Sequence, residues 1–493
     1  MSSYRQIFKS TALVGGAQVI TTIVGIVRTK ALALMLGTSG MGLAGLYMSA
    51  TGLVGSIAGL GIGTSGVRQI AEAAAKGDER RVACTVQTLR FTALLSGLVG
   101  TLVVLCCCVP IGRLTFGDDQ HAWGMAVVSF ALLFSNVSNG QIALLQGLRR
   151  LKDMVTAEIV GAVFGTVASI VLVYFLKDRG VPWFLVAMAA FAILTSWWFA
   201  RRVPVAKLAF HWRELIAEAR GLVGLGLAIM IAGLVAAGVA YLSRVLIRLQ
   251  LGLDAAGLFQ ATWALSTYYV GFILNAMSAD FTPRLAAAEN DHAAVNRMIN
   301  EQVEMGVLIA LPGVLATITL APWVLRIFYS KDFVAAADII RWQVMGVFLR
   351  VVCWPLGYVM IAKKKSLLFA TTEIAWGVLN VALILLCVKL WRLEGIGIAF
   401  AVFYLFVTIT VVFICWRLTG FQWSATALKI LAPAIAIQGL VFACSRFRPG
   451  AWSLGIGLAA TVAAGVVSLL ALQKLLGVNL WQGVRRKFQP RTP

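Results

Sequence analysis

The chain is 493 residues long, 60% of its residues are hydrophobic and only 13% are charged, and its mean hydropathy is +0.89. Because soluble domains carry about 25% charged residues, this composition excludes a soluble protein and indicates an all-α polytopic membrane protein without a large soluble domain. The formal net charge of +22 would favour a nucleic-acid partner in a soluble protein. Here most of the basic residues lie in short loops between apolar runs, so we expect no nucleic acid and interpret the charge as membrane topology.

The apolar runs predict about fourteen membrane-spanning helices, since about 20 apolar residues in a helix cross a bilayer. Their predicted ranges are 8–36, 41–70, 88–110, 123–145, 155–176, 183–200, 221–248, 256–281, 302–321, 338–361, 367–389, 395–416, 429–445 and 453–475. The eight cysteines fall mostly within these runs, and neither they nor the three histidines have the spacing of metal ligands. We therefore expect no metal, no cofactor and no disulfide framework.

The loops predict how the chain is oriented. If the N-terminus is cytoplasmic, the loops on that side hold the basic runs at 76–81, 149–152, 201–207 and 363–365 and the tail at 485–491. That side then carries far more Lys and Arg than the other, which is the bias that sets topology in membrane proteins. With an even number of spans, both termini are predicted to be cytoplasmic.

The chain contains an internal repeat. The segment LGTSGMGL (36–43) aligns with LGLDAAGL (251–258) at an offset of 215 residues, and VRQIAEAAAKGDERR (67–81) aligns with PRLAAAENDHAAVNR (283–297) at an offset of 216. Six predicted spans separate the two copies, so both copies enter the membrane from the same side. This predicts a parallel repeat of two six-helix lobes, related by an axis along the membrane normal.

The repeat predicts three parts of the chain. The N-terminal lobe comprises spans 1–6 (1–220), and the C-terminal lobe comprises spans 7–12 (221–416). Two additional spans and a basic cytoplasmic tail follow (417–493), outside the repeat.

Several basic residues lie inside the apolar runs. Arg28 and Lys30 lie late in the first span, Arg244 and Arg248 hold the equivalent place in the second copy, and Arg350 lies near the middle of the tenth span. A central Arg or Lys costs about 2.5–3.5 kcal/mol on insertion scales and usually faces a bundle interior or a water-filled cavity. The alternative is snorkelling, in which a long side chain near a span end reaches the headgroups.

The choice between a cavity and snorkelling differs from one basic residue to another. Arg68 and Arg284 lie at matched inner ends of spans, so for them and for Arg248 snorkelling or contact with lipid phosphate stays open. The other basic positions favour a cavity. Arg350 favours it most, because both ends of its span are distant.

Acidic residues are poor partners for these cations. Asp280, Glu158 and Glu373 lie near predicted span ends, and no predicted span carries a carboxylate at its centre. The interior is therefore predicted to be net cationic and to favour an anionic ligand, and Arg in particular matches phosphate with two parallel hydrogen bonds. The three carboxylates are candidate proton carriers for coupled transport, and each also suits a structural pair at a helix end.

One glycine-rich stretch, GLGIGTSG (59–66), superficially resembles a phosphate-binding loop. It lies within an apolar run, with no strand before it and no Lys-Ser or Lys-Thr after it. We therefore interpret it as close helix packing by small residues.

Two segments resemble a known family of transporters. LGTSGMGLAGLY (36–47) is similar to the polysaccharide-transporter branch of the multidrug/oligosaccharidyl-lipid/polysaccharide (MOP) flippase superfamily. The segment 330–376 is similar to the O-antigen and enterobacterial common antigen translocases. The matching positions are Phe333, Asp338, Trp342, Gln343, Gly346, Arg350, Gly357, Tyr358, Lys363 and Glu373, and Lys30 matches a further basic position. The resemblance covers roughly residues 8–416, and the last two spans depart from the twelve-span pattern of that family.

The resemblance implies a flippase and not an enzyme. Such a protein moves an undecaprenyl-pyrophosphate-linked oligosaccharide repeat unit from the cytoplasmic to the periplasmic leaflet of the bacterial inner membrane, as a step of O-antigen and lipopolysaccharide biosynthesis. Its two lobes would rock between inward-open and outward-open states around a cationic cavity, while the polyprenyl tail stays among the membrane lipids. The resemblance also makes the polysaccharide polymerase and the chain-length regulator candidate partners.

Three other functions were weighed against this one. A drug antiporter of the same superfamily depends on membrane-embedded carboxylates, and the predicted spans lack a central one. A lipid II flippase for peptidoglycan is closer in mechanism, but the segment 330–376 favours the oligosaccharide branch. A membrane glycosyltransferase or polymerase usually needs acidic catalytic groups or a sizeable loop, and no predicted outside loop is long.

Overall fold

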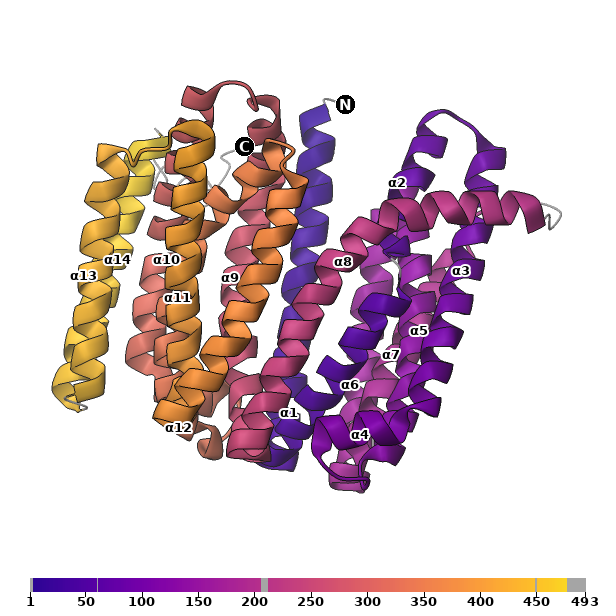
Figure 1. Cartoon of the computed structure of the whole chain (residues 1–493), viewed down its shortest axis with the longest axis horizontal. Helices are drawn as coiled ribbons and strands as arrows, with labels where there is room; N and C mark the ends of the chain where they lie inside the picture. Colours follow the sequence, from indigo (N-terminus) through magenta and orange to yellow (C-terminus); the bar gives the residue numbers. More distant parts are fainter. Residues whose placement is uncertain (1–2, 60, 205–211, 448–449, 477–493) are drawn as a thin grey trace, which may run out of the picture. The chain divides into compact units, whose positions relative to one another are not determined.

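The computed structural model describes residues 3–59, 61–204, 212–447 and 450–476. Side chains are described in these ranges except at 3–12, 212–229 and 475–476 and at scattered positions from 232 to 283. Every secondary-structure element of the described residues is helical (Figure 1). The helices up to the middle of the chain are α1 (Ser3–Ala58), α2 (Ile62–Ala75), α3 (Glu79–Cys106), α4 (Cys108–Phe116), α5 (Ala122–Gly147), α6 (Leu151–Leu176), the 3₁₀ helix η1 (Lys177–Arg179), α7 (Gly180–Ala200) and α8 (Trp212–Leu251). The others are α9 (Leu253–Ala287), α10 (His292–Phe328), the 3₁₀ helix η2 (Lys331–Ala336), α11 (Ala337–Ala362), α12 (Ser366–Thr419), α13 (Ala425–Phe447) and α14 (Ala451–Leu476).

Backbone breaks divide the longest helices into segments of membrane-spanning length. α1 changes direction at Gly37 (φ 65°), and Gly252 (φ 90°) separates α8 from α9. α12 breaks at Arg392, where φ is 48°. Glycine adopts a positive φ at little cost because it lacks a Cβ. Both copies of the repeat therefore turn at their aligned glycine.

The number of spans agrees with the prediction from the sequence. Ten segments of the described chain are long and apolar enough to cross a membrane. Three of these segments contain a break, at Gly37, at η1 and at Arg392, and α9 adds one helix of 35 residues. The described residues thus contain fourteen helices of membrane-spanning length, and the all-α prediction is confirmed.

One predicted span has a different boundary. The run at 41–70 is predicted as one helix, but α1 ends at Ala58 and α2 begins at Ile62. Gly61 lies between them with a φ of 63°, in the left-handed region. Apolar composition continues across this turn, so hydropathy alone does not reveal it, whereas the glycines at 59 and 61 are the residues that permit it.

The residues form two compact units by their internal contacts, and the N-terminal unit comprises residues 1–260 with 328–332. In this unit α7 packs between α5 and α6, α3 packs on α5, and α1 runs beside α6 (Figure 1). Ile70, Leu89 and Leu145 are among the fully buried residues of its core. These contacts hold six membrane-length helices together as one bundle.

The C-terminal unit comprises residues 261–327 and 333–493. α11 packs along α12, and α13 packs on α14 and on α11. An edge-to-face contact between the rings of Trp342 and Phe442, with centroids 4.5 Å apart, joins α11 to α13. The Ser424 hydroxyl, which precedes α13, donates a hydrogen bond of 2.7 Å to Glu304 of α10. The two helices beyond the repeat are thus fixed to this unit.

The two repeat segments touch each other within the N-terminal unit. A Cβ built on Gly42 would lie 2.3 Å from the carbonyl oxygen of Leu253, and a Cβ built on Gly257 would lie 1.8 Å from the carbonyl oxygen of Thr38. At the repeat offset of 215, Thr38 corresponds to Leu253 and Gly42 to Gly257. The same backbone contact is therefore made twice, as a local two-fold axis requires. Thr38 Oγ1 also donates to Asp254 Oδ1 at 2.5 Å.

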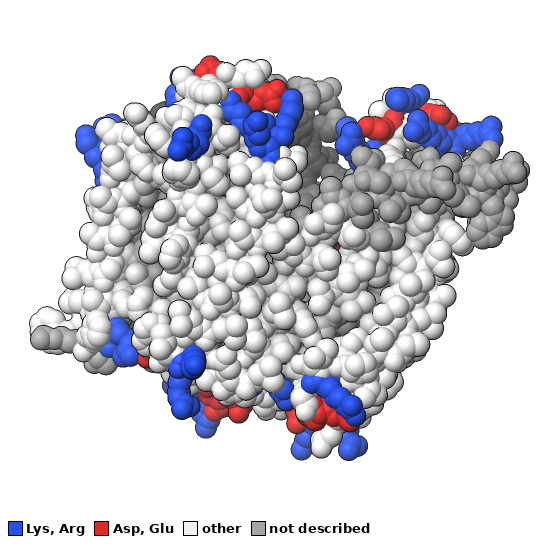
Figure 2. All heavy atoms as spheres, viewed as in Figure 1, with Lys and Arg blue, Asp and Glu red and all other residues white. Residues whose placement is uncertain are grey.

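The outer surface has the distribution of charge expected in a bilayer. In each unit, Lys, Arg, Asp and Glu gather at the two ends of the helices, and the lateral face between them is white in this view (Figure 2). Large apolar side chains such as Phe175, Val378 and Phe413 are more than half exposed. Such a surface is stable when lipid rather than water covers it.

Candidate functional site

Arg350 lies at the middle of α11, about 18–20 Å from either end of that helix at 1.5 Å per residue. Its side chain is half-buried, and its guanidinium carbon is 5.9 Å from the centroid of the Tyr404 ring. Among the described residues no acceptor receives a hydrogen bond from its guanidinium. Within the described part of the chain, the guanidinium donors of Arg350 are therefore available at the middle of an apolar helix.

The Tyr404 ring beside Arg350 belongs to a series of aromatic side chains in the C-terminal unit. The rings of Trp354 and Tyr358 are tilted against each other with centroids 4.5 Å apart, and the Tyr404 ring lies 4.8 Å from the Phe400 ring. Phe281 and Trp263 of α9 extend the row at 6.0 and 5.8 Å from Trp354 and Phe400. We call these six rings the aromatic strip. Trp263, Trp354, Tyr358 and Tyr404 are partly exposed.

The aromatic strip is a feature that the sequence analysis missed, although a signal for it exists. Arg350, Trp354 and Tyr358 are four residues apart, and so are Phe400 and Tyr404. Residues four apart share one face of a helix. An arginine among aromatic faces offers charge for a phosphate and flat apolar surface for a sugar ring.

Arg244, in α8, is buried at 8% exposure and donates two hydrogen bonds within the protein. Nε donates to Gln260 Oε1 at 2.9 Å, and Nη1 donates to the carbonyl oxygen of Ala240 at 2.9 Å. Its guanidinium carbon also lies 5.5 Å from the centroid of the Phe259 ring. Gln260 in turn lies against Gly45, where a Cβ would be 2.9 Å from Oε1. Arg244 is thus tied to the crossing of the two repeat segments.

Arg248 and Arg28 contact other helices of the N-terminal unit. The guanidinium of Arg248 lies against Gly117 at the end of α4, where a Cβ would be 2.6 Å from Nη1. Nη1 of Arg28 lies 2.8 Å from the sulfur of Met188 in α7. Lys30 is half-buried, like Arg28.

The two basic residues predicted at matched inner ends, Arg68 and Arg284, are both exposed. Nε of Arg68 lies 3.6 Å from Glu72 Oε1, and the Arg68 side chain is 68% exposed. An exposed pair of this kind contributes little to stability. Within the N-terminal unit, Arg68 on α2 and Arg248 beside α4 lie at opposite ends of the bundle, so they do not form one cluster (Figure 1).

The candidate coupling carboxylates have different surroundings. Glu158 on α6 is exposed and Glu373 on α12 is half-buried, and within the described part of the chain neither forms an ion pair. The side chain of Asp280 lies outside the described residues. No group of three His, Cys, Asp or Glu in the described residues could hold a metal ion, and the eight cysteines are free thiols.

The stretch 59–66 lines a pocket of about 710 Å³ in the N-terminal unit, which we call the α2-end pocket. Gly66 packs against Leu89, where a Cβ would meet Cδ1 at 2.9 Å, and this contact fits the predicted helix packing. The pocket also contains Arg68, and the Asn136 amide nitrogen at its wall is buried without a hydrogen-bond partner among the described residues. The sequence analysis did not anticipate a pocket there, because it forms between α1, α2, α3 and α5.

Comparison with known proteins points to one family. The family model described as "Polysaccharide biosynthesis protein" matches residues 31–338 of this chain. The lipid III flippase of Escherichia coli (strain K12) is 26% identical over 368 residues, which are 71% of this chain and 84% of the relative. The lipid III flippase of Shigella flexneri matches with the same identity and coverage.

Solved structures of the MOP superfamily have the same fold. The lipid II flippase MurJ in an inward closed conformation superposes with a TM-score of 0.67 at 12% identity, over 94% of this chain and 99% of that one. An inward-facing multidrug resistance transporter of the MATE family superposes with a TM-score of 0.64 at 18% identity, over 81% of this chain and 95% of that one. At these identities the likeness concerns the fold alone, and it confirms the predicted architecture.

Proposed function

Because the chain belongs to the polysaccharide biosynthesis protein family, in the polysaccharide-transporter branch of the MOP superfamily, we propose that it is a flippase for a lipid-linked oligosaccharide. Its substrate is an undecaprenyl-pyrophosphate-linked repeat unit, which it carries from the cytoplasmic to the periplasmic leaflet of a bacterial inner membrane by alternating access. The 26% identity to the lipid III flippase of Escherichia coli (strain K12) supports this substrate class. The reaction is transport, so no residue is assigned a catalytic role.

The environment of Arg350 is the observation that carries the proposal. A guanidinium in the middle of a membrane helix is costly unless it has a partner, and Arg350 has only the Tyr404 ring among the described residues. A pyrophosphate carries at least two negative charges and accepts paired hydrogen bonds from a guanidinium. Arg350 therefore binds the pyrophosphate, and the partly exposed rings of Trp354 and Tyr358 pack against the sugars.

The remaining basic residues have graded roles in this proposal. Arg28 and Lys30 contribute positive potential to the cavity, and Arg244 holds the segment around Gln260 in place through its hydrogen bonds. Arg248, and the exposed Arg68 and Arg284, attract the anionic headgroup as it enters or leaves, because long-range attraction raises the local concentration of a charged ligand. The cationic cavity in which these residues act is itself proposed.

Orientation and coupling complete the proposal. Both termini are cytoplasmic, since that orientation puts the larger share of Lys and Arg inside. Glu158, Glu373 and Asp280 are the carboxylates through which proton movement could be coupled to transport. The polysaccharide polymerase and the chain-length regulator are proposed to receive the translocated unit.

A lipid II flippase is the second candidate, and a drug antiporter of the same superfamily is the third. Lipid II also contains a pyrophosphate, so Arg350 suits it equally, and only the glycan separates the two flippase functions. An antiporter for organic cations would place a carboxylate where Arg350 lies, because a cation in a low-dielectric site needs an opposite charge.

Transport by purified protein in proteoliposomes tests the proposal. We expect flipping of undecaprenyl-pyrophosphate oligosaccharide, a much smaller rate for the monophosphate analogue, and a smaller effect of exchanging the sugars. Arg350→Ala should lower the pyrophosphate rate at least about thirty-fold, since a lost charge-assisted contact costs about 2 kcal/mol or more. Arg417→Ala is the matched control, because Arg417 lies 5.2 Å from the Trp416 ring but at the end of α12.

Two results would contradict the proposal. One is an equal rate for the pyrophosphate and the monophosphate lipid. The other is an equal loss in Arg350→Ala and Arg417→Ala at matched amounts of folded protein. Preferred flipping of lipid II over every oligosaccharide lipid would select the second candidate, and export of organic cations would select the third.

A further inference from the structure

A second pocket of about 710 Å³ lies at the opposite end of the N-terminal unit, and we call it the α4-end pocket. Its volume is within the range of about 300–1,000 Å³ that is usual for small-ligand sites. Three segments that are far apart in the sequence form its wall: residues 43–47 of α1, residues 120–123 before and at the start of α5, and residues 176–183 around η1. None of the basic residues assigned to the pyrophosphate lines it.

Aromatic side chains form much of the wall of the α4-end pocket. Trp123 and Trp183 line it and are 43% and 45% exposed, and Tyr47 lines it from the buried side. Tyr47 is held in place because its hydroxyl donates to the carbonyl oxygen of His121 at 3.3 Å, and a Cβ on Gly124 would lie 2.0 Å from that hydroxyl. Two indole side chains therefore line a pocket in which the Tyr47 side chain is fixed.

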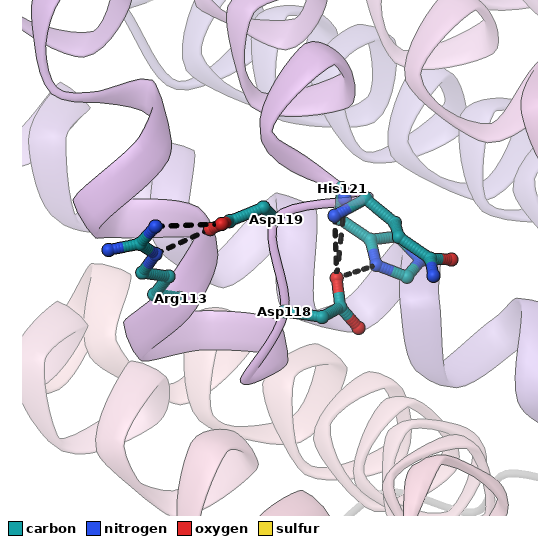
Figure 3. Close-up of polar contacts among 5 residues, drawn as sticks. Arg113, Asp118, Asp119 and His121 are labelled. Carbon is teal, nitrogen blue, oxygen red and sulfur yellow. Dashed lines mark hydrogen bonds and ion pairs between the residues drawn. The ribbon is translucent and has the colours of Figure 1, made fainter.

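The loop that carries one wall of the pocket is fixed by its own hydrogen bonds (Figure 3). The Asp118 carboxylate lies 2.8 Å from His121 Nδ1 and accepts a hydrogen bond from the Gln120 backbone N–H at 3.1 Å, while Arg113 binds Asp119 with two hydrogen bonds. Partial burial alone would raise the pKa of Asp118, but these hydrogen bonds and the charge of His121 outweigh it and lower the pKa. The carboxylate thus stays ionised and holds the loop.

Polar side chains at the rim of the pocket are available to a ligand. Asp178, Arg179 and Gln120 line the pocket and are exposed. Within the described part of the chain, none of these three side chains has a hydrogen bond or an ion pair. A carboxylate, a guanidinium and an amide together offer acceptors and donors with no net charge.

This chemistry selects a neutral polyol over the other ligands that meet a transporter at this end. A phosphate would meet the repulsion of Asp178 beside the attraction of Arg179, and an organic cation would meet the reverse, so neither ion gains from the pair as a whole. A pyranose ring has one face of C–H groups that packs on the electron-rich face of an indole, and its hydroxyls both donate and accept hydrogen bonds. We propose that the α4-end pocket binds a neutral oligosaccharide, namely the glycan of the transported lipid.

This inference rests on the proposed function, and it adds a second contact of the protein with its substrate. Arg350 binds the pyrophosphate and Trp354 and Tyr358 pack against the sugars during transport, whereas Trp123, Trp183 and Asp178 bind the sugars in the α4-end pocket. Since η1 and the α4–α5 loop are predicted to lie outside the membrane on the periplasmic side, the pocket would retain the glycan after it crosses. Substrates with a longer glycan should depend on the pocket more than substrates with a single sugar.

Binding of lipid-free glycan to the purified full chain tests the inference. The probe is the repeat-unit glycan released by mild acid from the lipid-linked pool of the source cells, and tetramethylammonium chloride serves as a cation probe. We expect Trp183→Ala to weaken glycan binding at least about ten-fold through the lost stacking surface, and Asp178→Asn to weaken it by about five-fold. Trp197→Ala is the matched control, because Trp197 is also on α7 and 50% exposed, but it lies 4.8 Å from the Arg201 guanidinium and outside the pocket.

The outcomes separate this inference from the proposed function. Loss of glycan binding in Trp183→Ala, with full glycan binding in Trp197→Ala at matched amounts of folded protein, supports the pocket. Loss of glycan binding in Trp183→Ala, in a protein whose wild type flips no lipid, would refute the proposed function and keep the pocket. Equal binding by Trp183→Ala and Trp197→Ala, no binding of glycan by the wild type, or binding of tetramethylammonium in its place would overturn the inference.

Discussion

Arg244 and Arg350 are two arginines of apolar helices with similar aromatic neighbours and different hydrogen-bond partners. The Arg244 guanidinium carbon is 5.5 Å from the Phe259 ring, and the Arg350 guanidinium carbon is 5.9 Å from the Tyr404 ring. Arg244 donates to a side-chain amide and to a backbone carbonyl, both at 2.9 Å. The Arg350 guanidinium donates to no acceptor among the described residues.

This difference shows that the position of a cation in a membrane helix does not define its role. Placing either arginine within the membrane costs free energy, and groups that accept hydrogen bonds from the guanidinium reduce this cost. Arg244 finds its acceptors within the protein, so removing it leaves Gln260 unsatisfied. Arg350 has no such acceptor among the residues that the structure describes, so its acceptor is proposed to be the substrate. The comparison therefore predicts that one arginine governs stability and the other governs transport.

The largest effect on stability is expected for Arg244→Ala. Loss of the side chain leaves Gln260 Oε1 without this donor, removes the side-chain hydrogen bond to the carbonyl oxygen of Ala240, and opens a cavity. We expect the free energy of unfolding to fall by about 2–4 kcal/mol, measured by reversible unfolding in mixed micelles. The rate of flipping per folded molecule should stay within about two-fold, because the lost hydrogen bonds are internal.

A double substitution sharpens that test. Gln260→Leu alone should also destabilise the protein, because it leaves Arg244 without an acceptor. The pair Arg244→Met and Gln260→Leu removes both partners, which is often close to neutral for a buried polar pair. Full stability of Arg244→Ala, or a loss of transport without a loss of stability, would break the comparison.

Much of the fold follows from the sequence because its signals are local. Each membrane-spanning helix is a continuous apolar run, so fourteen spans are visible without any tertiary information. The repeat is visible because Gly37 and Gly252 both need a positive φ, and only glycine adopts it at little cost. The break near Gly61 is less visible, because the apolar composition continues through it.

The site is harder to predict because its partners come from other helices. Nothing in the spacing of Arg244 reveals that Gln260, across the turn at Gly252, accepts its hydrogen bond. The sequence therefore predicts that both Arg244 and Arg350 face a cavity, and it does not distinguish their hydrogen-bond partners. The spacing of four residues between Arg350 and Trp354 could have predicted an aromatic side chain on the same helix face as Arg350. The α4-end pocket could not be predicted in this way, because three segments that are distant in the sequence form it.

A smaller effect is expected for Arg350→Lys. Lysine keeps the positive charge but replaces the planar fork by a single ammonium, so one of two parallel hydrogen bonds to a phosphate is lost. We expect flipping to fall about ten-fold, between the wild type and Arg350→Ala. The control is Arg417→Lys at the end of α12, which should retain the full rate. A rate for Arg350→Lys as low as that for Arg350→Ala would mean that geometry, and not charge, is what the substrate requires.

The smallest effect is expected for the two aromatic neighbours, and it tests the comparison where the two sites are most alike. A cation–π contact contributes about 0.5–1 kcal/mol at an exposed site and more when desolvated, so Tyr404→Leu should lower flipping about three-fold by releasing the Arg350 guanidinium from its position. Phe259→Leu removes the corresponding ring beside Arg244, but the hydrogen bonds to Gln260 and Ala240 still hold that guanidinium. Flipping by Phe259→Leu should therefore match the wild type when rates are normalised to folded protein. If both leucine variants slow transport equally, the rings act through packing, and the distinction between an arginine held by the protein and an arginine that binds the substrate fails.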